Sequence, residues 1–181
     1  IRPANFPDNV PGNGFYAADI TLNNEIYKII VINLIGRIFM EPAESPFKKF
    51  DEIYNQFATV QKKIIIIDFH AEATSEKITL GFYVDGRASI LFGTHTHIQT
   101  ADAHILEKGT GYITDIGMCG SENSVIGVEK EIILKKFLTG LPAKNEVSLK
   151  EPLIFNAVLF SISLQNLQCK KIKSFYCHNV D

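Results

Sequence analysis

The sequence predicts a single α/β domain in which short apolar strands alternate with amphipathic helices. Three observations support this prediction. The chain has 181 residues, of which 46% are hydrophobic and 21% charged, as in an ordinary globular protein with a sizeable core. The β-rich run over residues 26–36 and the continuous apolar run over residues 64–67 have the length of strands, and the second indicates a sheet covered on both faces. Between them, residues 47–57 place apolar side chains at helical spacing.

The first third of the chain contains an irregular start, a strand and a helix. Residues 2–14 hold three prolines and two glycines, which predict an extended, turn-rich lead-in. The run from Ile26 predicts a buried strand that ends at Gly36. Residues 42–46 predict a loop, and Pro46 suits the first turn of the helix that follows, because it lacks an N–H that this turn would leave unpaired.

The rest of the chain continues the alternation of short strands and helices. In chain order, the pattern predicts a strand over 64–67, a helix that begins near Thr74 or Ser75 and ends between Gly81 and Gly86, strands over 88–92 and 112–115, a helix over 129–138, and strands over 153–164 and 171–177. No internal repeat, linker or low-complexity tract interrupts this pattern. We therefore expect one domain.

Charge and hydropathy argue against several classes of function. The formal net charge of −2 is unlike that of an electrostatic nucleic-acid binder, which needs a basic patch. The apolar runs are far too short to span a membrane, and the first residues lack the order of a secretory signal. The three cysteines have no metal-like spacing and are expected to carry free thiols. Together these features predict a cytoplasmic protein.

Three of the five histidines lie where predicted strands end in loops. His70 follows one apolar strand, and His95 and His97 follow the next, after Gly93 and Thr94. Ligands of open α/β sheets bind beyond the carboxyl ends of strands, so we expect these histidines to cluster. Thr94, Thr96 and Thr100 could orient an imidazole or hold the loop backbone by hydrogen bonds. In extended backbone His95 and His97 would project to one side, toward one metal ion or two ions about 3.5–4 Å apart. An ordinary surface or core pair remains the alternative.

Other polar residues are weaker candidates. Glu72 and Glu76 could orient an imidazole, although carboxylates are also favoured in the first turn of a helix. Arg37 could clamp a phosphate oxygen or equally form a surface salt bridge. His104 and His178 lack a strand-end context, and we expect a loop residue and a tail residue.

Five segments carry motifs that occur in this order in a known family. They are RPANFP from Arg2 to Pro7, GRIFM from Gly36 to Met40, DFHAEATSEK from Asp68 to Lys77, GTHTHIQTAD from Gly93 to Asp102, and TDIGM from Thr114 to Met118. The chain thus resembles the YmdB-like bacterial metallophosphoesterases of the calcineurin-like superfamily, and the two long motifs match almost verbatim. The resemblance covers nearly the whole chain. It implies an α/β sandwich of two β-sheets flanked by helices, with a dinuclear metal site at the sheet edges.

The resemblance also implies an activity and a set of ligands. His70 and His95 correspond to the family's ligands of one metal ion, and His97 to a ligand of the other. The implied cofactors are two divalent ions, iron or manganese, and the implied reaction is hydrolysis of phosphodiesters, including cyclic nucleotides, by a metal-bridging hydroxide. Arg37 and Asn5 are expected to contact this small-molecule substrate. The resemblance leaves open whether copies of the chain form a homo-oligomer.

One part of the family pattern is not found in the 181 residues. The family places an Asp, a Glu-Asn pair and a Gly-Asn-His motif before the segment that begins here at Arg2. On this pattern residues 1–181 are the C-terminal portion of one metallophosphoesterase domain, without an N-terminal βαβαβ unit of roughly 70 residues. That unit would supply most oxygen ligands and the general acid, so we assign no catalytic residue and expect the isolated chain to be inactive. The alternative is a non-catalytic remnant that acts as an interaction or regulatory module.

Overall fold

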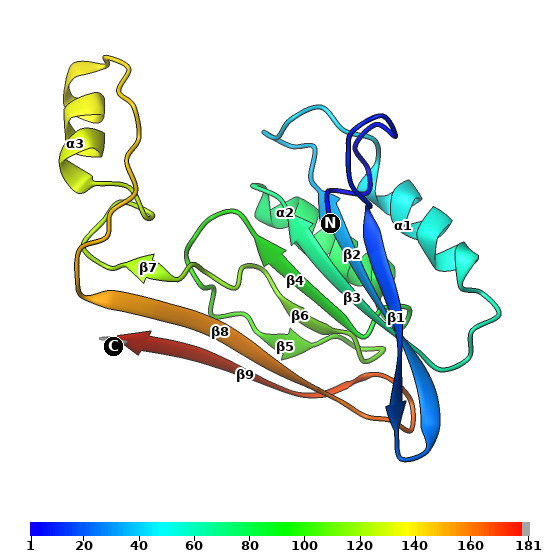
Figure 1. Ribbon diagram of the computed structural model, residues 1–181. Helices are drawn as coiled ribbons and strands as arrows, with labels where there is room; N and C mark the ends of the chain where they lie inside the picture. The colour runs from blue at the N-terminus through cyan, green and yellow to red at the C-terminus, as the bar shows by residue number, and fades with distance from the viewer. Residues whose placement is uncertain (179–181) are drawn as a thin grey trace.

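Two β-sheets face each other in the computed structural model, which describes residues 1–178 (Figure 1). Within these residues the larger sheet has the strand order β1-β2-β3-β4-β6-β5 and the smaller sheet the order β7-β8-β9. The strands are β1 (Phe15–Leu22), β2 (Glu25–Ile35), β3 (Lys63–His70), β4 (Ile90–Thr94), β5 (His104–Ile105), β6 (Gly111–Ile113), β7 (Gly120–Ser121), β8 (Leu153–Ile162) and β9 (Cys169–His178). The helices are α1 (Pro46–Gln56), α2 (Thr74–Val84) and α3 (Lys130–Thr139). The predicted sandwich of two sheets with flanking helices is confirmed.

The centre of the larger sheet is parallel because helices connect its strands. β2 pairs with β3, β3 with β4, and β4 with β6, all in parallel, while α1 joins β2 to β3 and α2 joins β3 to β4. Parallel strands connected in this way end at the same edge of the sheet. His70 is the last residue of β3, Thr94 is the last residue of β4, and the two are register partners. The fold therefore brings the ends of these two strands side by side.

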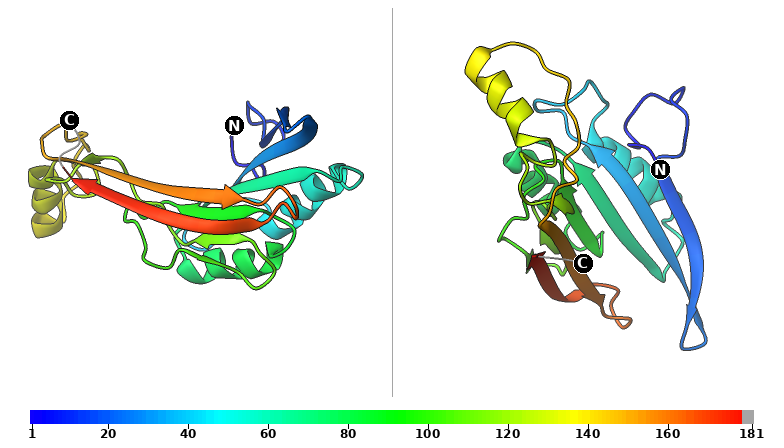
Figure 2. Two further views of the ribbon diagram at one scale, coloured as in Figure 1. Left: turned by 90° about the horizontal axis from the view of Figure 1, so that it is seen from below. Right: turned by 60° about the vertical axis from the view of Figure 1, so that its left-hand side comes forward.

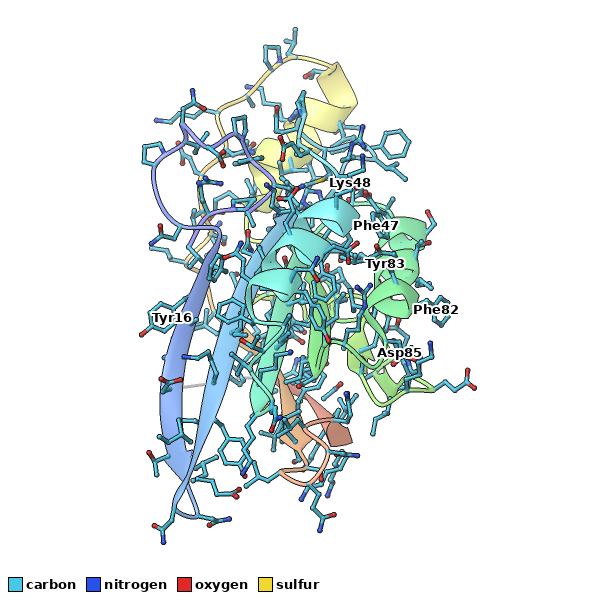
Figure 3. The ribbon with its side chains drawn as sticks, turned by 90° about the vertical axis from the view of Figure 1, so that its right-hand side faces the viewer. Tyr16, Phe47, Lys48, Phe82, Tyr83 and Asp85 are labelled. Carbon is cyan, nitrogen blue, oxygen red and sulfur yellow. The ribbon has the colours of Figure 1, made fainter. Side chains whose placement is uncertain are left out.

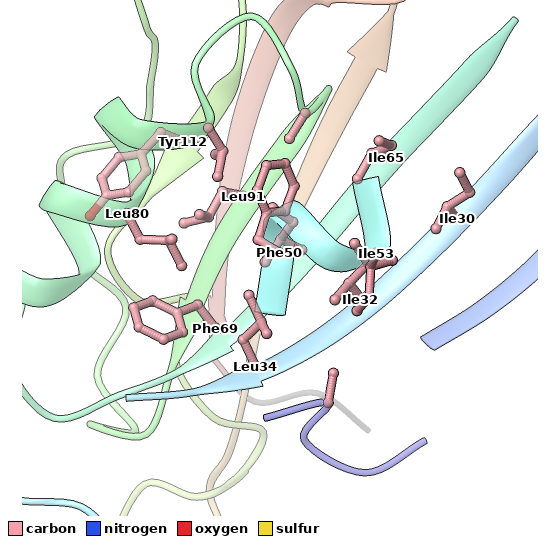
Figure 4. Packing of buried hydrophobic residues seen from close by; sticks show 14 of the residues in the cluster. Ile30, Ile32, Leu34, Phe50, Ile53, Ile65, Phe69, Leu80, Leu91 and Tyr112 are labelled. Carbon is pink, nitrogen blue, oxygen red and sulfur yellow. The ribbon is translucent and has the colours of Figure 1, made fainter. Parts of the chain in front are cut away.

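Helices α1 and α2 cover one face of the larger sheet, and the main hydrophobic core lies beneath them. Alternate residues of β2 and β3 point toward the helices, because successive side chains of a strand project to opposite faces. The buried side chains of this layer include Ile30, Ile32, Leu34, Ile65, Ile67, Phe69, Phe50, Ile53 and Leu80 (Figure 4). Between the helices, the rings of Phe47 and Tyr83 meet edge to face with centroids 5.2 Å apart (Figure 3). The helices thereby fix the sheet whose edge carries the histidines.

The smaller sheet lies against the opposite face and covers only part of it (Figure 2). Ile90 and Phe92 of the larger sheet and Val158 and Phe160 of β8 line one apolar space between the layers. On β1, by contrast, the side chain of Tyr16 is exposed. Within residues 1–178, the second layer therefore packs on the β4 side of the larger sheet.

Four elements differ from what the sequence alone predicts. The two-residue strands β5 and β7 are not predicted, and β5 contains His104, for which a loop is expected. β1 is not predicted, yet it pairs antiparallel with β2 through a turn at Asn23 and Asn24, whose φ values of 52° and 62° suit a tight hairpin. α3 is predicted as a helix, but none of its residues is buried and it projects from the body of the protein (Figure 1). None of the helices described within residues 1–178 has the length and apolar character that crossing a membrane requires.

Gly93 allows the backbone of β4 to approach the segment after β6 without a side chain between them. A Cβ atom on Gly93 would lie 1.8 Å from the carbonyl oxygen of Thr114. We predict that Gly93→Ala lowers the free energy of unfolding by about 3 kcal/mol, because the two backbones must separate. Urea unfolding measures this loss. Gly140→Ala is the control, because the added Cβ would meet no atom within 4 Å. The φ of 69° at this position is unfavourable for alanine, so the free energy of unfolding should fall by only about 1 kcal/mol. Equal losses in both variants would contradict the steric argument.

Candidate functional site

His70 and His95 are in direct contact at the carboxyl edge of the larger sheet. Nε2 of His70 lies 3.0 Å from Nδ1 of His95, and the rings are nearly perpendicular with centroids 4.8 Å apart. β3 places His70, and His95 directly follows the last residue of β4. Two nitrogens bound to one metal ion at about 2.1 Å, with a right angle between the bonds, lie about 3.0 Å apart. The separation of the two histidine nitrogens matches this spacing.

A chain of hydrogen bonds determines which nitrogen of His70 faces His95. Asn33 Nδ2 donates to Asp68 Oδ2 at 2.8 Å, and Thr94 Oγ1 donates to Asp68 Oδ1 at 3.0 Å. The hydroxyl of Thr94 has then used its only proton, so it accepts from Nδ1 of His70, also at 3.0 Å. The proton of His70 is therefore on Nδ1, and Nε2 directs its lone pair toward His95.

Burial favours the neutral form of His70. Desolvation is the largest cause that lowers the pKa of His70, nearby His95 lowers it further, and Asp68 acts in the opposite direction. Burial also raises the pKa of Asp68, against the hydrogen bonds from Thr94 and Asn33. A neutral imidazole is the form that binds a metal ion. The surroundings of His70 thus suit a metal ligand.

Glu72 lies against the other nitrogen of His95. Its Oε2 is 3.2 Å from His95 Nε2. A proton on Nε2 can donate to this carboxylate, which leaves the lone pair of Nδ1 facing Nε2 of His70. Two lone pairs 3.0 Å apart repel each other unless a proton or a cation lies between them. The pair of rings is therefore an arrangement with affinity for a cation.

His97 has its own hydrogen-bond partner. Its Nδ1 lies 2.9 Å from the carbonyl oxygen of Ile126, which can only accept, so the proton is on Nδ1 and Nε2 is free. Within residues 1–178, no hydrogen bond joins His97 to His70 or His95. The structure thus brings two of the three predicted ligands into contact and holds the third two residues farther along the same loop.

The backbone of His95 and His97 is not extended, and the expectation from their spacing is wrong in this respect. Their φ values are 116° and 67°, in a region that residues other than glycine rarely adopt. Such residues cost about 1–3 kcal/mol each and persist only where the surrounding structure holds them. The positions of both rings therefore depend on what holds this loop.

The buried carboxylate of Asp115 holds the histidine loop. Its Oδ2 accepts from the backbone N–H of Thr96 and from Lys77 Nζ, both at 2.9 Å, and its Oδ1 accepts from Gly117 N at 2.9 Å. The side chains of Lys77 and Asp115 are 0% and 1% exposed. Burial alone would raise the pKa of Asp115, but hydrogen bonds from Gly117, Thr96 and Lys77 outweigh it and hold the pKa below its usual value. Because Thr96 lies between the two histidines, Asp115 fixes the backbone of both.

Arg37 and Asn5, the expected substrate contacts, have no hydrogen bond to the histidines within the described residues. The buried amide of Asn5 donates to the carbonyls of Ile35 and Glu44 and accepts from Ile35 N, so it joins the lead-in to β2. Arg37 lines a separate cavity near Glu76, whose carboxylate accepts from the backbone N–H of Arg37. Glu76 thus fixes a loop and not an imidazole. The two substrate contacts stay predictions.

Asp68, Lys77 and Asp115 are parts of the site that the sequence did not predict. One signal was available for Asp68, because residues two apart on a strand share a face, and it precedes His70 by two. No comparable signal pairs Lys77 with Asp115, which are 38 residues apart. Thr94, which the sequence predicts to orient an imidazole, contacts His70 as expected.

The donors present fit part of a metal site. His70 and His95 offer two imidazole nitrogens and Glu72 a carboxylate, the ligand types that divalent transition metals accept. Within residues 1–178, no group of three or more His, Cys, Asp or Glu side chains surrounds one metal position. The described residues therefore fit a metal ion as two of its ligands, not as a closed set. All three cysteines are free in the structure.

We predict that Asp115→Asn lowers the free energy of unfolding by about 3–5 kcal/mol, because it leaves the ammonium of Lys77 buried without a counter-charge. Urea unfolding followed by circular dichroism measures the loss. Lys28→Met, which breaks the partly exposed pair with Asp19, is the control and should cost at most about 1 kcal/mol. The double variant Lys77→Met/Asp115→Asn should lose less than the sum of the two single losses. Strict additivity would contradict the pairing.

Comparisons with known proteins bear on both the fold and the family. The chain is 46% identical over 173 residues to the 2′,3′-cyclic-nucleotide 2′-phosphodiesterase of Bacillus subtilis (strain 168), a match that covers 96% of this chain. A hypothetical protein from Thermus thermophilus superposes with a TM-score of 0.87 at 36% identity, over 99% of this chain and 68% of that one. A novel phosphatase from Mycoplasma pneumoniae superposes with a TM-score of 0.87 at 34% identity, over 100% of this chain and 64% of that one.

The chain spans 63% of the length of the Bacillus subtilis relative. Within this span the similarity is continuous, since a family model described as YmdB-like protein matches residues 1–175. The match includes the strand ends, the histidine loop and the buried residues that hold it. The chain therefore belongs to the YmdB-like protein family.

Proposed function

We propose that this chain provides the histidine part of the active site of a metal-dependent phosphodiesterase, which hydrolyses small phosphodiesters such as cyclic nucleotides. The observation that carries the proposal is the pair His70 and His95, whose facing nitrogens are 3.0 Å apart. In both rings the other nitrogen is held by a side chain of this protein, Thr94 or Glu72. The substrate class comes from the activity that the Bacillus subtilis relative is named for.

In this proposal each histidine binds through its free nitrogen. His70 Nε2 and His95 Nδ1 hold one divalent ion, iron or manganese, and His97 Nε2 holds a second. Such a pair of ions, when bound, lowers the pKa of a shared water and stabilises negative charge on the phosphoryl oxygens. Thr94 and Glu72 keep the lone pairs of the first two rings directed at the ion. Ile126 does the same for His97 through its carbonyl oxygen.

The reaction needs groups beyond those that the described residues bring together. Two divalent ions about 3.5–4 Å apart repel strongly, so such sites use bridging carboxylates. Within residues 1–178, Glu72 is the carboxylate in contact with the histidine pair. We place the bridging carboxylate and the general acid in the part of the longer relatives that this chain does not span.

Activity assays of two lengths of the protein test this proposal. A form that spans the length of the Bacillus subtilis relative should hydrolyse bis-p-nitrophenyl phosphate with added manganese, and the 181-residue chain should turn over almost nothing. In the longer form His95→Ala should remove nearly all activity, because a lost ligand misplaces the metal. His104→Ala is the matched control, since the ring of His104 is exposed. Among the described residues, its hydrogen-bond partner is the carbonyl oxygen of Asp102 alone.

The outcomes separate the parts of the proposal. Robust turnover by the 181-residue chain would overturn the need for further ligands. Undiminished turnover by His95→Ala would overturn the ligand assignment. Inactivity of the longer form would favour a non-catalytic interaction or regulatory module.

The hydroxyl of Thr94 gives a second prediction. Thr94→Val keeps the shape of the side chain but frees the Nδ1 proton of His70, so the affinity of the longer form for manganese should fall about 10- to 100-fold. Isothermal titration calorimetry measures this affinity. Thr94→Ser should bind nearly as well as the parent, and Thr79→Val, at an exposed hydroxyl on α2, should have no effect. Unchanged manganese affinity in Thr94→Val would rule out a role for the hydrogen bonds from His70 through Thr94 to Asp68 in orienting the ligand.

A further inference from the structure

We propose that the cavity beside His97 binds the nucleobase of the substrate, an inference that rests on the proposed function and extends it. The cavity has a volume of about 490 Å³, within the range of small-molecule sites. It lies between the loop that follows His97 and the inner face of β8 and β9. Nothing in the roles of His70, His95 or Asp115 accounts for it.

The position of the cavity links it to the histidine pair. His97 lines the cavity, and its ring is oriented by the carbonyl oxygen of Ile126. His95 is two residues away on the same loop, whose backbone Asp115 holds through Thr96. One loop therefore contributes both to the histidine pair and to the wall of the cavity.

The walls of the cavity suit a flat aromatic ligand. The side chains of Ile98 and Tyr176 line it and are 61% and 53% exposed, so both present apolar surface to a ligand in the cavity. Tyr176 projects from the inner face of β9, as does its register partner Asn156 from β8. Exposed aromatic side chains can stack on any nucleobase, because every base has a flat π-face. A bound base would cover both exposed walls.

Among the described residues, the polar side chains that line the cavity carry no fixed charge. Within the described residues, no Asp, Glu, Lys or Arg lines it. The side chains that line the cavity therefore offer a second phosphate no counter-charge of their own, whereas an uncharged base needs none. The buried Asn156 donates to the carbonyl of Met118 at 2.6 Å, while its Oδ1 accepts no hydrogen bond from residues 1–178.

Kinetics in the longer form test the inference separately from catalysis. Two substrates are compared: 2′,3′-cyclic AMP and methyl ribofuranoside 2,3-cyclic phosphate, which has the same reacting group but no base. Tyr176→Ala should lower kcat/KM for cyclic AMP about tenfold through KM, and should leave the substrate without a base unaffected. Tyr176→Phe keeps the ring and should behave as the parent. Tyr16→Ala is the matched control, because it removes an exposed tyrosine on β1, the edge strand of the larger sheet (Figure 3).

Each result has one interpretation. Failure of the parent to hydrolyse either substrate would refute the proposed function and leave the cavity to be judged by binding alone. Equal losses on both substrates in Tyr176→Ala would overturn the base site, because they would place Tyr176 in the fold or the metal site. No loss on either substrate would also overturn it.

Binding of adenosine, which has no phosphate, tests the cavity without any reaction or metal. Saturation-transfer NMR on the 181-residue chain should show contact to the base protons of adenosine. The signal should disappear in Tyr176→Ala and persist in Tyr16→Ala. A signal of equal strength in both variants, or none in the parent, would overturn the assignment.

Discussion

The candidate site depends on one buried interaction, the ion pair between Lys77 and Asp115. A buried charge pair survives only when its remaining hydrogen-bond groups are also satisfied, and Asp115 meets this condition by accepting from Thr96 N and Gly117 N as well. These contacts join α2, the end of β6 and the histidine loop at one carboxylate. Together with the hydrogen bonds of His97 to the carbonyl oxygen of Ile126 and from the backbone N–H of Met118, they offset the unfavourable φ values of His95 and His97. The pair thus matters less for the stability it adds than for the loop conformation it enforces.

The sequence predicts the central fold because burial leaves a strong signal there. The apolar runs of β2 and β3 and the helical spacing of α1 are visible without any tertiary information. β1 is not predicted because it is an edge strand with one exposed face. Its apolar and polar residues alternate too weakly to distinguish it from the irregular start of the chain. α3 is recognisable as a helix from its sequence. The exposure of Phe137 and Leu138 is not predicted, because it depends on which other elements pack against the helix.

The identities of the site residues are easier to predict than their geometry. The motifs identify His70, His95 and His97, and the strand ends place the first two together, as the contact between their rings shows. Backbone conformation is different, because the loop with its positive φ values is held by the carboxylate of Asp115, which lies after another strand. Polar residues are ambiguous for a related reason. Asn5 lies in one of the family motifs, yet all its amide contacts are with backbone, and only coordinates distinguish that role from a substrate contact.

The two histidines of the contact pair are not held equally, and this has a consequence for the proposed chemistry. His70 sits at the end of a paired strand and is fixed through Thr94 and Asp68, whereas His95 depends on the strained loop and on a carboxylate at the surface. Its ring is therefore the more adjustable of the two. The same loop continues through His97 into the wall of the proposed base cavity. A base that orders this wall would reduce the conformational entropy that the loop still loses when the metal binds, and so would raise the affinity for the metal. By thermodynamic linkage, a bound metal would raise the affinity for the base by the same factor. The metal centre and the cavity would then bind their ligands cooperatively, through a loop whose backbone Asp115 holds at Thr96 and Thr100.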